Sequence, residues 1–516
     1  MLSPRFLTMG VEVHQDPFGL YARASQELSG STGTVLLETR DAELDARRSR
    51  IPSSQDLRHV MVLRTAVRLE GRGSRVDLIA ESETGRDLLQ RLEGPGLVSQ
   101  GPELSVFESP SPTPSADEDA RLTEPSSLDA LRLILGELDV ADDELAPSLV
   151  LLTSHELMER FEPTIAAVRT AAGERSEPDY VAFVPEISLE VFEGRGLIRR
   201  LVLGSDLEEP RADLRRTAQL AEQVHPFEVS PPPSLSYSVD VSDERYAEGV
   251  QRCRAHILDG DAYQIVLSRS FSGRCNSPRD GYARLRQTCP SPYGFLVEAD
   301  DFSLFGSSPE TAVKVTDGDV EVSPIAGTRP RGQRDGVLDA DLDARFEAEL
   351  RQDEKENAEH LMLVDLARND VARVAERGRT RVERLLTVAR FSQVMHLVSE
   401  VRGRLRSDMD ALHALRATLN PGTLVGAPKI RAAQILGSLE ANRRGFYGGA
   451  IALFRSAREM DSAIIIRSAV VRDGQAIVRA GAGIVADSDP WLEAQETRSK
   501  AANVLHALGL SEGAGA

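Results

Sequence analysis

The stretch that decides the fold class is residues 463–508, which read AIIIRSAVVRDGQAIVRAGAGIVADSDPWLEAQETRSKAANVLHAL. The apolar run 463–471, the turn Arg472-Asp473-Gly474 and the alternating run 475–480 predict a β-hairpin. Pro490 directly follows Asp489, and proline in the first turn favours a helix that begins there. Hairpins followed by helices, without regular βαβ alternation, predict an α+β fold.

The rest of the chain supports this mixture and suggests a division near residue 230. Helical spacing covers 128–138, 243–258 and 338–375, and strand-like alternation covers 34–38, 56–69, 263–272, 301–305 and 313–322. The proline-rich segment 226–238 is typical of a connection between two parts. We therefore expect an N-terminal part over 1–230, interleaved with the main fold, and a second part over 240–516.

Composition excludes several classes of protein. The 516 residues include 61 Lys+Arg and 81 Asp+Glu, so the net charge of −20 disfavours general nucleic-acid binding. No apolar run approaches the roughly 18 residues of a membrane span, and the N-terminus lacks a signal-peptide pattern. The three cysteines, Cys253, Cys275 and Cys289, have no metal-site or CxxC spacing. We expect a soluble cytoplasmic protein without a membrane or nucleic-acid partner.

Two pairs of glutamates are candidates for a metal site. Glu356 and Glu359 lie three residues apart in one predicted helix, and Glu493 and Glu496 have the same spacing in the last helix. This spacing places both carboxylates of a pair on one helical face. Carboxylates are ligands that Mg²⁺ accepts, usually one or two of them together with substrate and water. From spacing alone a solvated acidic face is the more common explanation, since two such pairs are expected by chance in a chain with 81 acidic residues.

Three further features are ambiguous from the residues alone. Arg467 interrupts an apolar run, where it is compatible with an edge position, a buried ion pair or the binding of a carboxylate. The small residues 480–483, AGAG, either let backbone N–H groups approach an anion or form a tight turn or bulge. His396 lies in the apolar run QVMHLVSEV, where a hydrogen-bonded core histidine is the more common outcome.

Taken together, the motifs of residues 240–510 resemble the large subunit of anthranilate synthase, in the family of chorismate-utilising enzymes. They occur in the order of that family: GSSPE (306–310), PIAGTRPRG (324–332), ENAEHLMLVDLARND (356–370), FSQVMHLVS (391–399), NPGTLVGAPKIRA (420–432), RRGFYGGA (443–450), IIIRSAVV (464–471), AGAGIVADSDP (480–490) and EAQETRSKA (493–501). The resemblance implies an α+β fold with a large antiparallel β-sandwich flanked by helices.

The resemblance also assigns roles to individual residues. Glu356, Glu359, Glu493 and Glu496 match the Mg²⁺ site, directly or through water. Substrate-binding positions are Tyr447 and Arg467 for the ring carboxylate, the backbone of Gly481, Ala482 and Gly483, Lys500 for the enolpyruvyl carboxylate, and the hydroxyl of Thr423. The catalytic positions are Glu310, which helps the ring hydroxyl leave, His396, near the reacting ring, and Thr328, a pocket hydroxyl.

The implied activity is the Mg²⁺-dependent conversion of chorismate and ammonia into anthranilate and pyruvate, through an aminodeoxyisochorismate intermediate. Ala326 and Gln264 stand where related enzymes carry lysines, which favours ammonia as the nucleophile. Ammonia would come from a separate glutamine amidotransferase subunit, so we expect a hetero-oligomer that serves tryptophan biosynthesis. The alternative is an enzyme of a secondary-metabolite pathway, which either stops at the intermediate or escapes feedback inhibition. A third hypothesis is a non-catalytic relative that binds a ligand.

The N-terminal part matches the family less well, in the segments implied to bind tryptophan as an inhibitor. LLETRD (36–41) has Thr39 where serine is usual, and CPSPYGF (289–295) has Gly294 where methionine is usual. The implied inhibitor site comprises Glu38, Thr39, Pro292, Tyr293 and Gly294. The segment VLLTSHELMERFE (150–162) has leucines where the family has glycines. These departures lead us to expect weakened or absent inhibition by tryptophan.

Overall fold

The computed structural model describes residues 3–14, 16–30, 33–40, 57–110, 118–139, 146–167, 177–223, 226–334, 337–390 and 394–512. Its architecture is organised around two long antiparallel strands, β3 (Leu57–Arg72) and β8 (Tyr180–Phe192). These two strands pair with each other, and each changes the strand that it pairs with on its other edge midway along its length. Strand β3 pairs first with β2 (Thr34–Arg40) and then with β4 (Arg75–Ala80). Strand β8 pairs first with β7 (Leu149–Thr153) and then with β9 (Arg195–Val202).

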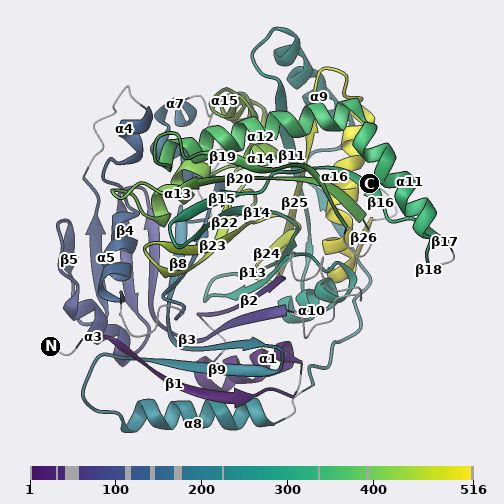
Figure 1. The fold of residues 1–516 in the computed structure, drawn as a ribbon. Helices are drawn as coiled ribbons and strands as arrows, with labels where there is room; N and C mark the ends of the chain where they lie inside the picture. Colours follow the sequence, from purple (N-terminus) through teal and green to yellow (C-terminus); the bar gives the residue numbers. More distant parts are fainter. Residues whose placement is uncertain are drawn as a thin grey trace.

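Because of these changes of partner, the sheet divides into two layers that share β3 and β8 (Figure 1). On one side of β3 and β8, the first layer extends through β9 to β1 (Arg5–Glu12). On the other side, the strand order is β2, β12 (Tyr293–Glu298), β13 (Ser303–Ser308), β24 (Ser468–Arg472), β25 (Gln475–Ile484) and β11 (Gln264–Arg274). The ends of β11 pair with β10 (Leu235–Val239) and β21 (Gly426–Ala427), and β10 runs parallel to β26 (Leu510–Glu512).

The second layer extends from the other ends of β3 and β8. On one side lie β4, β6 (Leu104–Glu108) and β5 (Leu97–Ser99). On the other side the order is β7, β22 (Ala450–Ser456), β23 (Glu459–Ile464), β14 (Thr311–Thr316), β15 (Asp319–Val322), β20 (Val394–Arg404) and β19 (Arg381–Arg390), with β16 (Ile325–Pro330) beside β15 on the same edge of β20. Strands β17 (Gln333–Arg334) and β18 (Val337–Leu338) form a separate pair.

Three hydrophobic cores hold these layers together. Side chains from both layers, including Val62, Phe183 and Phe295, meet between them, which makes the arrangement a sandwich. The outer face of the first layer is covered by α1 (Pro17–Ser29), α8 (Glu208–Glu222), α10 (Pro278–Thr288) and α16 (Pro490–Leu508). The outer face of the second is covered by α3 (Glu83–Arg91), α5 (Asp129–Glu137), α12 (Glu354–Val374) and α13 (Ala411–Thr418). The predicted α+β fold with a helix-flanked antiparallel sandwich is confirmed.

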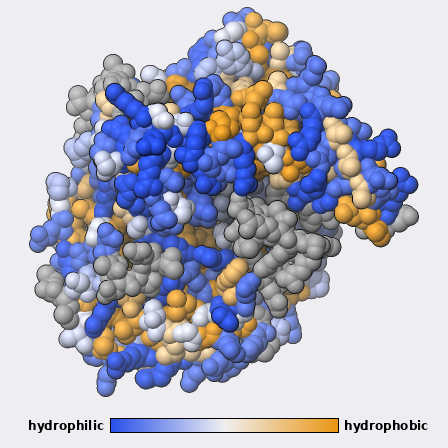
Figure 2. Space-filling model, viewed as in Figure 1, coloured by the Kyte–Doolittle hydropathy of each residue, from blue (hydrophilic) through white to orange (hydrophobic). Residues whose placement is uncertain are grey.

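The remaining helices are shorter or lie at the ends of the sandwich. Helices α9 (Asp243–Leu258) and α15 (Lys429–Leu439) pack in a fourth core beside β11 and β25. The others are α4 (Glu118–Leu122), α6 (Met158–Phe161), α7 (Pro163–Ala166), α11 (Ala340–Gln352) and α14 (Gly422–Val425). Hydrophilic residues cover much of the face seen in Figure 2, and apolar residues gather there in smaller areas.

Several predicted elements form where expected, and others are interrupted. The helix predicted over 243–258 is α9, with the Ser242 hydroxyl accepting from the amide of Arg245, and the last helix begins at Pro490. The single helix predicted over 338–375 is wrong, because the extended backbone of Asp353 separates α11 from α12. The strand predicted over 463–471 is also wrong as one element, since it breaks before Arg467.

Within the described part of the chain, no helix is long and apolar enough to cross a membrane.

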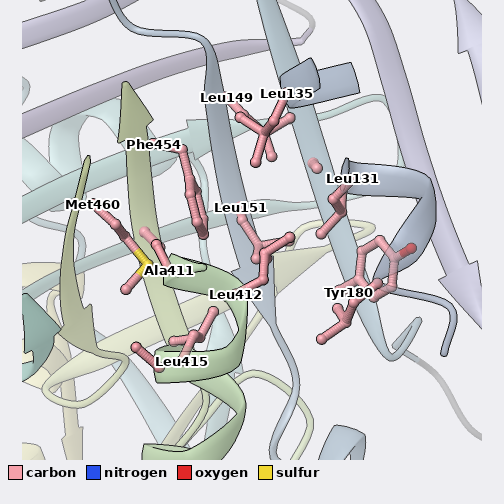
Figure 3. Packing of buried hydrophobic residues seen from close by; sticks show 14 of the residues in the cluster. Leu131, Leu135, Leu149, Leu151, Tyr180, Ala411, Leu412, Leu415, Phe454 and Met460 are labelled. Atoms are coloured by element: carbon pink, nitrogen blue, oxygen red, sulfur yellow. The ribbon is translucent and has the colours of Figure 1, made fainter. Parts of the chain in front are cut away.

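The packing of α13 on the second layer gives a test of this core. Leu412 is almost fully buried and belongs to the same cluster as Leu151 and Phe454 (Figure 3). Leu412→Ala should lower the free energy of unfolding by about 2–5 kcal/mol, because a cavity remains where the side chain packed. Leu361→Ala, at a position 46% exposed, should cost less than about 1 kcal/mol. Urea unfolding followed by circular dichroism compares them, and equal losses would contradict the assignment of this core.

Candidate active site

Glu310 is an acid placed between two strands, β13 and β14, and it is half-buried. Burial raises the pKa of its carboxyl group to about 7, although the Thr423 hydroxyl and the charge of Lys500 act in the opposite direction. The Thr423 hydroxyl donates to Glu310 Oε1 at 2.9 Å. A carboxyl group with a pKa near neutrality can give a proton to a leaving group and take one back. The geometry therefore suits Glu310 to the general-acid role.

His396 and Thr328 face each other across the strand pair β16–β20. The His396 Nδ1 atom lies 3.0 Å from the carbonyl oxygen of Gly327 and 3.1 Å from the Thr328 hydroxyl. Burial lowers the pKa of His396, and the nearby positive charge of Arg467 lowers it further, while the Gly327 contact opposes them. Burial and the charge of Arg467 therefore both favour the neutral form of the ring. In the tautomer in which Nδ1 donates to the Gly327 carbonyl, Nε2 is the ring nitrogen that carries the lone pair.

Arg467 is the half-buried cation of this region. It lies between β23 and β24 with a φ of 51°, in the left-handed region that residues other than glycine rarely adopt. Its carbonyl oxygen accepts from the amide of Ser307 at 3.1 Å, which fixes this conformation. The guanidinium makes no hydrogen bond or ion pair with any residue that the structure describes. Of the alternatives for this residue, the buried ion pair is wrong, and a guanidinium open to an anionic ligand remains.

Tyr447 packs against the glycine-containing strand β25. Its side chain is 7% exposed, and burial raises its pKa. A Cβ atom on Gly481 would lie 3.3 Å from the Tyr447 hydroxyl and 2.8 Å from the carbonyl oxygen of Leu267, so a larger residue would displace one of them. The alternative that AGAG forms a tight turn is wrong, because Gly481, Ala482 and Gly483 pair in regular register with β11. The side chain of Ala482 is buried in the core beside α9.

Lys500 connects the glycine strand to the acidic residues of α16. Its Nζ atom donates to the carbonyl oxygen of Gly481 at 3.0 Å and lies 2.7 Å from Glu496 Oε1. Its charge also stabilises ionised Glu310. Lys500 thus brings together three groups that are far apart in the sequence: the acid, the glycine backbone and the glutamates.

The four candidate metal ligands come from α12 and α16. Burial raises the pKa of Glu359, with further increases from the like charges of Glu356 and Glu496. Burial also raises the pKa of Glu493, as does its neighbour Glu496. Glu359 and Glu496 therefore interact across the two helices. Their present partners are cations: Lys355 lies 3.8 Å from Glu359, and Arg329 lies 3.5 Å from Glu356.

This donor set fits Mg²⁺ in chemistry, although the side chains do not form a closed cage. Among the described residues, no group of three or more His, Cys, Asp or Glu side chains is arranged to hold a metal ion. Oxygen donors that raise one another's pKa carry excess negative charge, which a hard cation relieves. Mg²⁺ needs only one or two protein carboxylates when substrate and water complete its coordination.

The residues of the implied inhibitor site are divided between two faces of the sheet. Glu38 pairs with Gly294, and Thr39 pairs with Tyr293, so the two pairs point to opposite faces. Glu38 lines a cavity of about 390 Å³ with Arg286 and Gly294, and Pro292 accepts the amide of Arg40 through its carbonyl oxygen at 2.9 Å. Tyr293 donates away from this cavity, to Asp461 at 3.1 Å.

Glu38 already has partners within the protein. Its carboxylate accepts from the Tyr282 hydroxyl at 2.6 Å and from Arg286 at 2.7 Å, and His59 lies 2.9 Å away. Burial would raise the pKa of Glu38, but Arg286 and His59 hold it well below its usual range. A Cβ atom on Gly294 would lie 2.6 Å from the Tyr282 hydroxyl. The glycine therefore allows this cluster to form.

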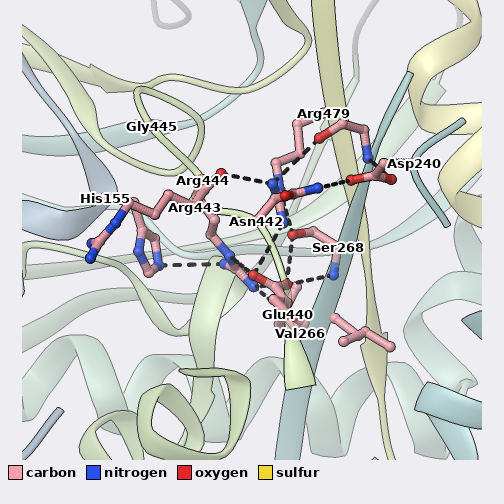
Figure 4. Close-up of polar contacts among 12 residues, drawn as sticks. His155, Asp240, Val266, Ser268, Glu440, Asn442, Arg443, Arg444, Gly445 and Arg479 are labelled. Atoms are coloured by element: carbon pink, nitrogen blue, oxygen red, sulfur yellow. Dashed lines mark hydrogen bonds and ion pairs between the residues drawn. The ribbon is translucent and has the colours of Figure 1, made fainter. Parts of the chain in front are cut away.

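A buried ionic network behind Tyr447 was not predicted. Arg444 and Arg479 share the carboxylate of Glu440, which also accepts from the amide and hydroxyl of Ser268 (Figure 4). These groups lower the pKa of Glu440 to about 2 in spite of its burial. The RRG sequence at 443–445 gives no sign of partners that are distant in the chain.

Comparison with known proteins agrees with the fold and with these motifs. The family described as chorismate binding enzyme matches residues 100–506. The chain belongs to this family of enzymes.

Individual relatives have more specific names. The pyocyanine-specific anthranilate synthase component 1 of Pseudomonas aeruginosa is 47% identical over 90% of this chain and 89% of its own. Anthranilate synthase component 1 of Escherichia coli is 42% identical over 92% of both chains. Among solved structures, anthranilate synthase component I from Streptococcus pneumoniae is similar, with a TM-score of 0.69, 27% identity and coverage of 89% of this chain and 93% of that one. The predicted family is confirmed.

Removal of the open guanidinium gives a direct test of the pocket. Arg467→Ala should weaken the binding of chorismate about tenfold or more, because a charged hydrogen bond to a carboxylate is lost. Arg431→Ala, which removes a surface arginine paired with Asp261 at 2.8 Å, should leave binding unchanged. Isothermal titration calorimetry of both variants measures the difference. Equal affinities would exclude Arg467 from the pocket.

Proposed function

We propose that this chain is the large subunit of an anthranilate synthase. It converts chorismate and ammonia into anthranilate, pyruvate and water. The observation that carries the proposal is the arrangement of Glu310, with a pKa of about 7, beside Lys500, in the same region as the open guanidinium of Arg467. Together these groups supply an acid and two cations for a substrate with two carboxylates.

Each residue contributes a defined step. Arg467 and Tyr447 hold the ring carboxylate, and Lys500 and the amides of Gly481 and Gly483 hold the enolpyruvyl carboxylate. Protonated Glu310 gives its proton to the departing ring hydroxyl while ammonia forms the new C–N bond, so water leaves and aminodeoxyisochorismate results. Loss of a ring proton toward His396 Nε2 then accompanies cleavage of the C–O bond, which releases pyruvate and gives the aromatic ring.

Ammonia, rather than water or a lysine, is the proposed nucleophile. Ala326 lies on β16 opposite Leu397 and offers no amine. Gln264 is 9% exposed, beside Gly483, and its Oε1 atom is buried without a hydrogen-bond partner among the described residues. An amide is not a base that could activate water, whereas ammonia needs no activation.

Mg²⁺ is the proposed cofactor, and Glu356, Glu359, Glu493 and Glu496 would hold it, one or two of them directly and the others through water. When bound, it would neutralise a substrate carboxylate and fix its position. The raised pKa values of Glu359 and Glu493 support this assignment, since a cation would replace mutual repulsion by attraction.

The proposed partner is a separate glutamine amidotransferase that supplies ammonia, in a cytoplasmic hetero-oligomer. The relatives are named component 1, which supports the existence of a second component. We assign residues 240–516 to the chorismate-binding part and residues 1–230 to an interleaved regulatory part.

A second candidate function is anthranilate or aminodeoxyisochorismate synthesis for a secondary-metabolite pathway, without inhibition by tryptophan. Two observations favour it: one relative at 47% identity is named pyocyanine-specific, and the Glu38 carboxylate is fully engaged by Tyr282, Arg286 and His59. An amino acid ligand would have to compete with these partners.

Product analysis distinguishes the candidates. The purified chain, given chorismate, Mg²⁺ and ammonium chloride, should form fluorescent anthranilate and pyruvate in equal amounts. Accumulation of a non-aromatic amino product would support the alternative, and no product would contradict both. Addition of tryptophan at micromolar concentration separates a regulated enzyme from an insensitive one.

The Thr423 hydrogen bond predicts a shift in pH dependence. Activity needs protonated Glu310, so kcat/KM should fall as pH rises through about 7. The Thr423 hydroxyl stabilises the ionised form, so Thr423→Val should raise the pKa and move the alkaline limb to higher pH. Steady-state rates from pH 6 to about 9 measure the limb. The residual activity of Glu310→Gln should not show this alkaline fall. If the alkaline limb of Thr423→Val lies at the same pH as that of the wild type, the assignment of Glu310 as the titrating acid is wrong.

The metal assignment predicts a loss of Mg²⁺ binding without a loss of fold. Glu359→Gln and Glu496→Gln should each weaken Mg²⁺ binding about tenfold or more, because a carboxylate ligand becomes neutral. Melting without metal should be unchanged or higher, since repulsion is relieved. Glu354→Gln, at the exposed start of α12, is the control. Calorimetry with MgCl₂ measures binding, and wild-type affinity in both variants would place the ion elsewhere.

A further inference from the structure

The turn that carries Tyr447 rests on a segment of the N-terminal part. Glu156, in the short 3₁₀ helix His155–Leu157 that follows β7, is 3% exposed. One of its carboxylate oxygens accepts from the amide of Arg444 at 2.7 Å, and the other accepts from the amide of Gly445 at 3.1 Å. A carboxylate that accepts two consecutive amides fixes the orientation of both peptide planes.

Neighbouring backbone groups extend this contact. The amide of His155 donates to the carbonyl oxygen of Gly445 at 2.7 Å, and the Thr153 hydroxyl accepts from the amide of Ala450 at 2.9 Å. A Cβ atom on Gly449 would overlap the carbonyl oxygen of Thr153. The whole turn from 444 to 450 therefore lies against residues 153–156.

Arg444 anchors the same turn on its other side. Its guanidinium donates to the Glu440 carboxylate (Figure 4). It also donates to the carbonyl oxygen of Val266 at 2.7 Å and to that of Leu424 at 2.6 Å. Tyr447 follows three residues later, and its amide donates to the carbonyl oxygen of Arg444 at 3.3 Å. The backbone of Arg444 is thus fixed by Glu156, and its side chain by the catalytic part.

We propose that Glu156 is a positioning residue for substrate binding, acting through Tyr447. This inference rests on the proposed function, in which Tyr447 holds a carboxylate of chorismate. Without the Glu156 carboxylate, two buried amides lose their acceptor, and the turn relaxes to satisfy them. The Tyr447 hydroxyl, set above Gly481, then loses its alignment with the ligand.

The primary test uses two glutamates of the same segment. Glu156→Gln should weaken chorismate binding about tenfold, because an amide group offers only one acceptor to two donors. KM should rise with little change in kcat, as expected for contacts made equally in ground and transition states. Glu159→Gln is the matched control: Glu159 is also buried, but it accepts from the Arg443 side chain at 3.3 Å. Its affinity should stay within about twofold of wild type.

A double-variant cycle separates positioning from general loss of structure. In a Tyr447→Phe background, Glu156→Gln should have little further effect on affinity, because the group that it aligns is absent. Glu156→Asp, which keeps both acceptor oxygens, should recover part of the loss. Independent, multiplicative effects of the two substitutions would overturn the proposal, as would wild-type affinity in Glu156→Gln.

Separate measurements test the proposed function and the positioning role of Glu156. Calorimetry with chorismate measures binding without any requirement for product. Absence of anthranilate from the wild-type chain would contradict the proposed function, whereas the binding cycle tests Glu156 by itself. Circular dichroism confirms that each variant is folded. If Glu156→Gln does not fold, Glu156→Asp with its Tyr447→Phe partner completes the same cycle.

Discussion

The burial of Arg444 is the constraint on which the candidate site depends. A guanidinium removed from water is costly unless every donor has an acceptor in good geometry. Its acceptors are the carboxylate of Glu440 at the end of α15, the carbonyl of Val266 in β11 and the carbonyl of Leu424 in α14. These three elements must be in place together. The turn to Tyr447 begins at this residue, so satisfying one buried charge also places the side chain that we propose to bind substrate.

Charge is distributed in a way that suits an anionic substrate in an acidic protein. A net charge of −20 cannot attract a dianion over long distances. The buried arginines contribute little to attraction, since two buried carboxylates, Glu440 and Glu156, offset the charges of Arg444 and Arg479. Arg467 is different, because no acid among the described residues pairs with it. Recognition must therefore act at short range, where a half-buried guanidinium without a partner in the described part of the chain interacts most strongly with an anion.

Local patterns predict much of this fold, and tertiary contacts determine the rest. Helix α9 and its Ser242 cap, strand β11 and helix α16 follow from periodicity and capping residues alone. The positive φ of Arg467 does not, because a continuous apolar run predicts a strand, whereas tertiary contacts such as the hydrogen bond from Ser307 hold the break in place. The break at Asp353 is also not predicted, because the helical periodicity continues across this residue. The Asp353 carboxylate accepts from the amide of Glu356 and so caps the start of α12.

The site residues divide in the same way. Motifs single out Glu310, His396 and the glutamates as candidates, because their residue types and order are distinctive. The pKa of Glu310 needs the structure, since burial causes it. Glu156 gives no signal of its own, because its partners are backbone amides 288 and 289 residues away, and an amide has no sequence signature.

Ser307 connects the cavity at Glu38 with the candidate substrate pocket. It pairs with Gly294 across β12 and β13 and lines that cavity. Its amide is also the donor that holds Arg467 at a strained backbone conformation. A residue at a positive φ keeps that conformation only while its surroundings enforce it. Any rearrangement of β13 at Ser307 therefore acts directly on the Arg467 backbone through this hydrogen bond, which physically links the two regions.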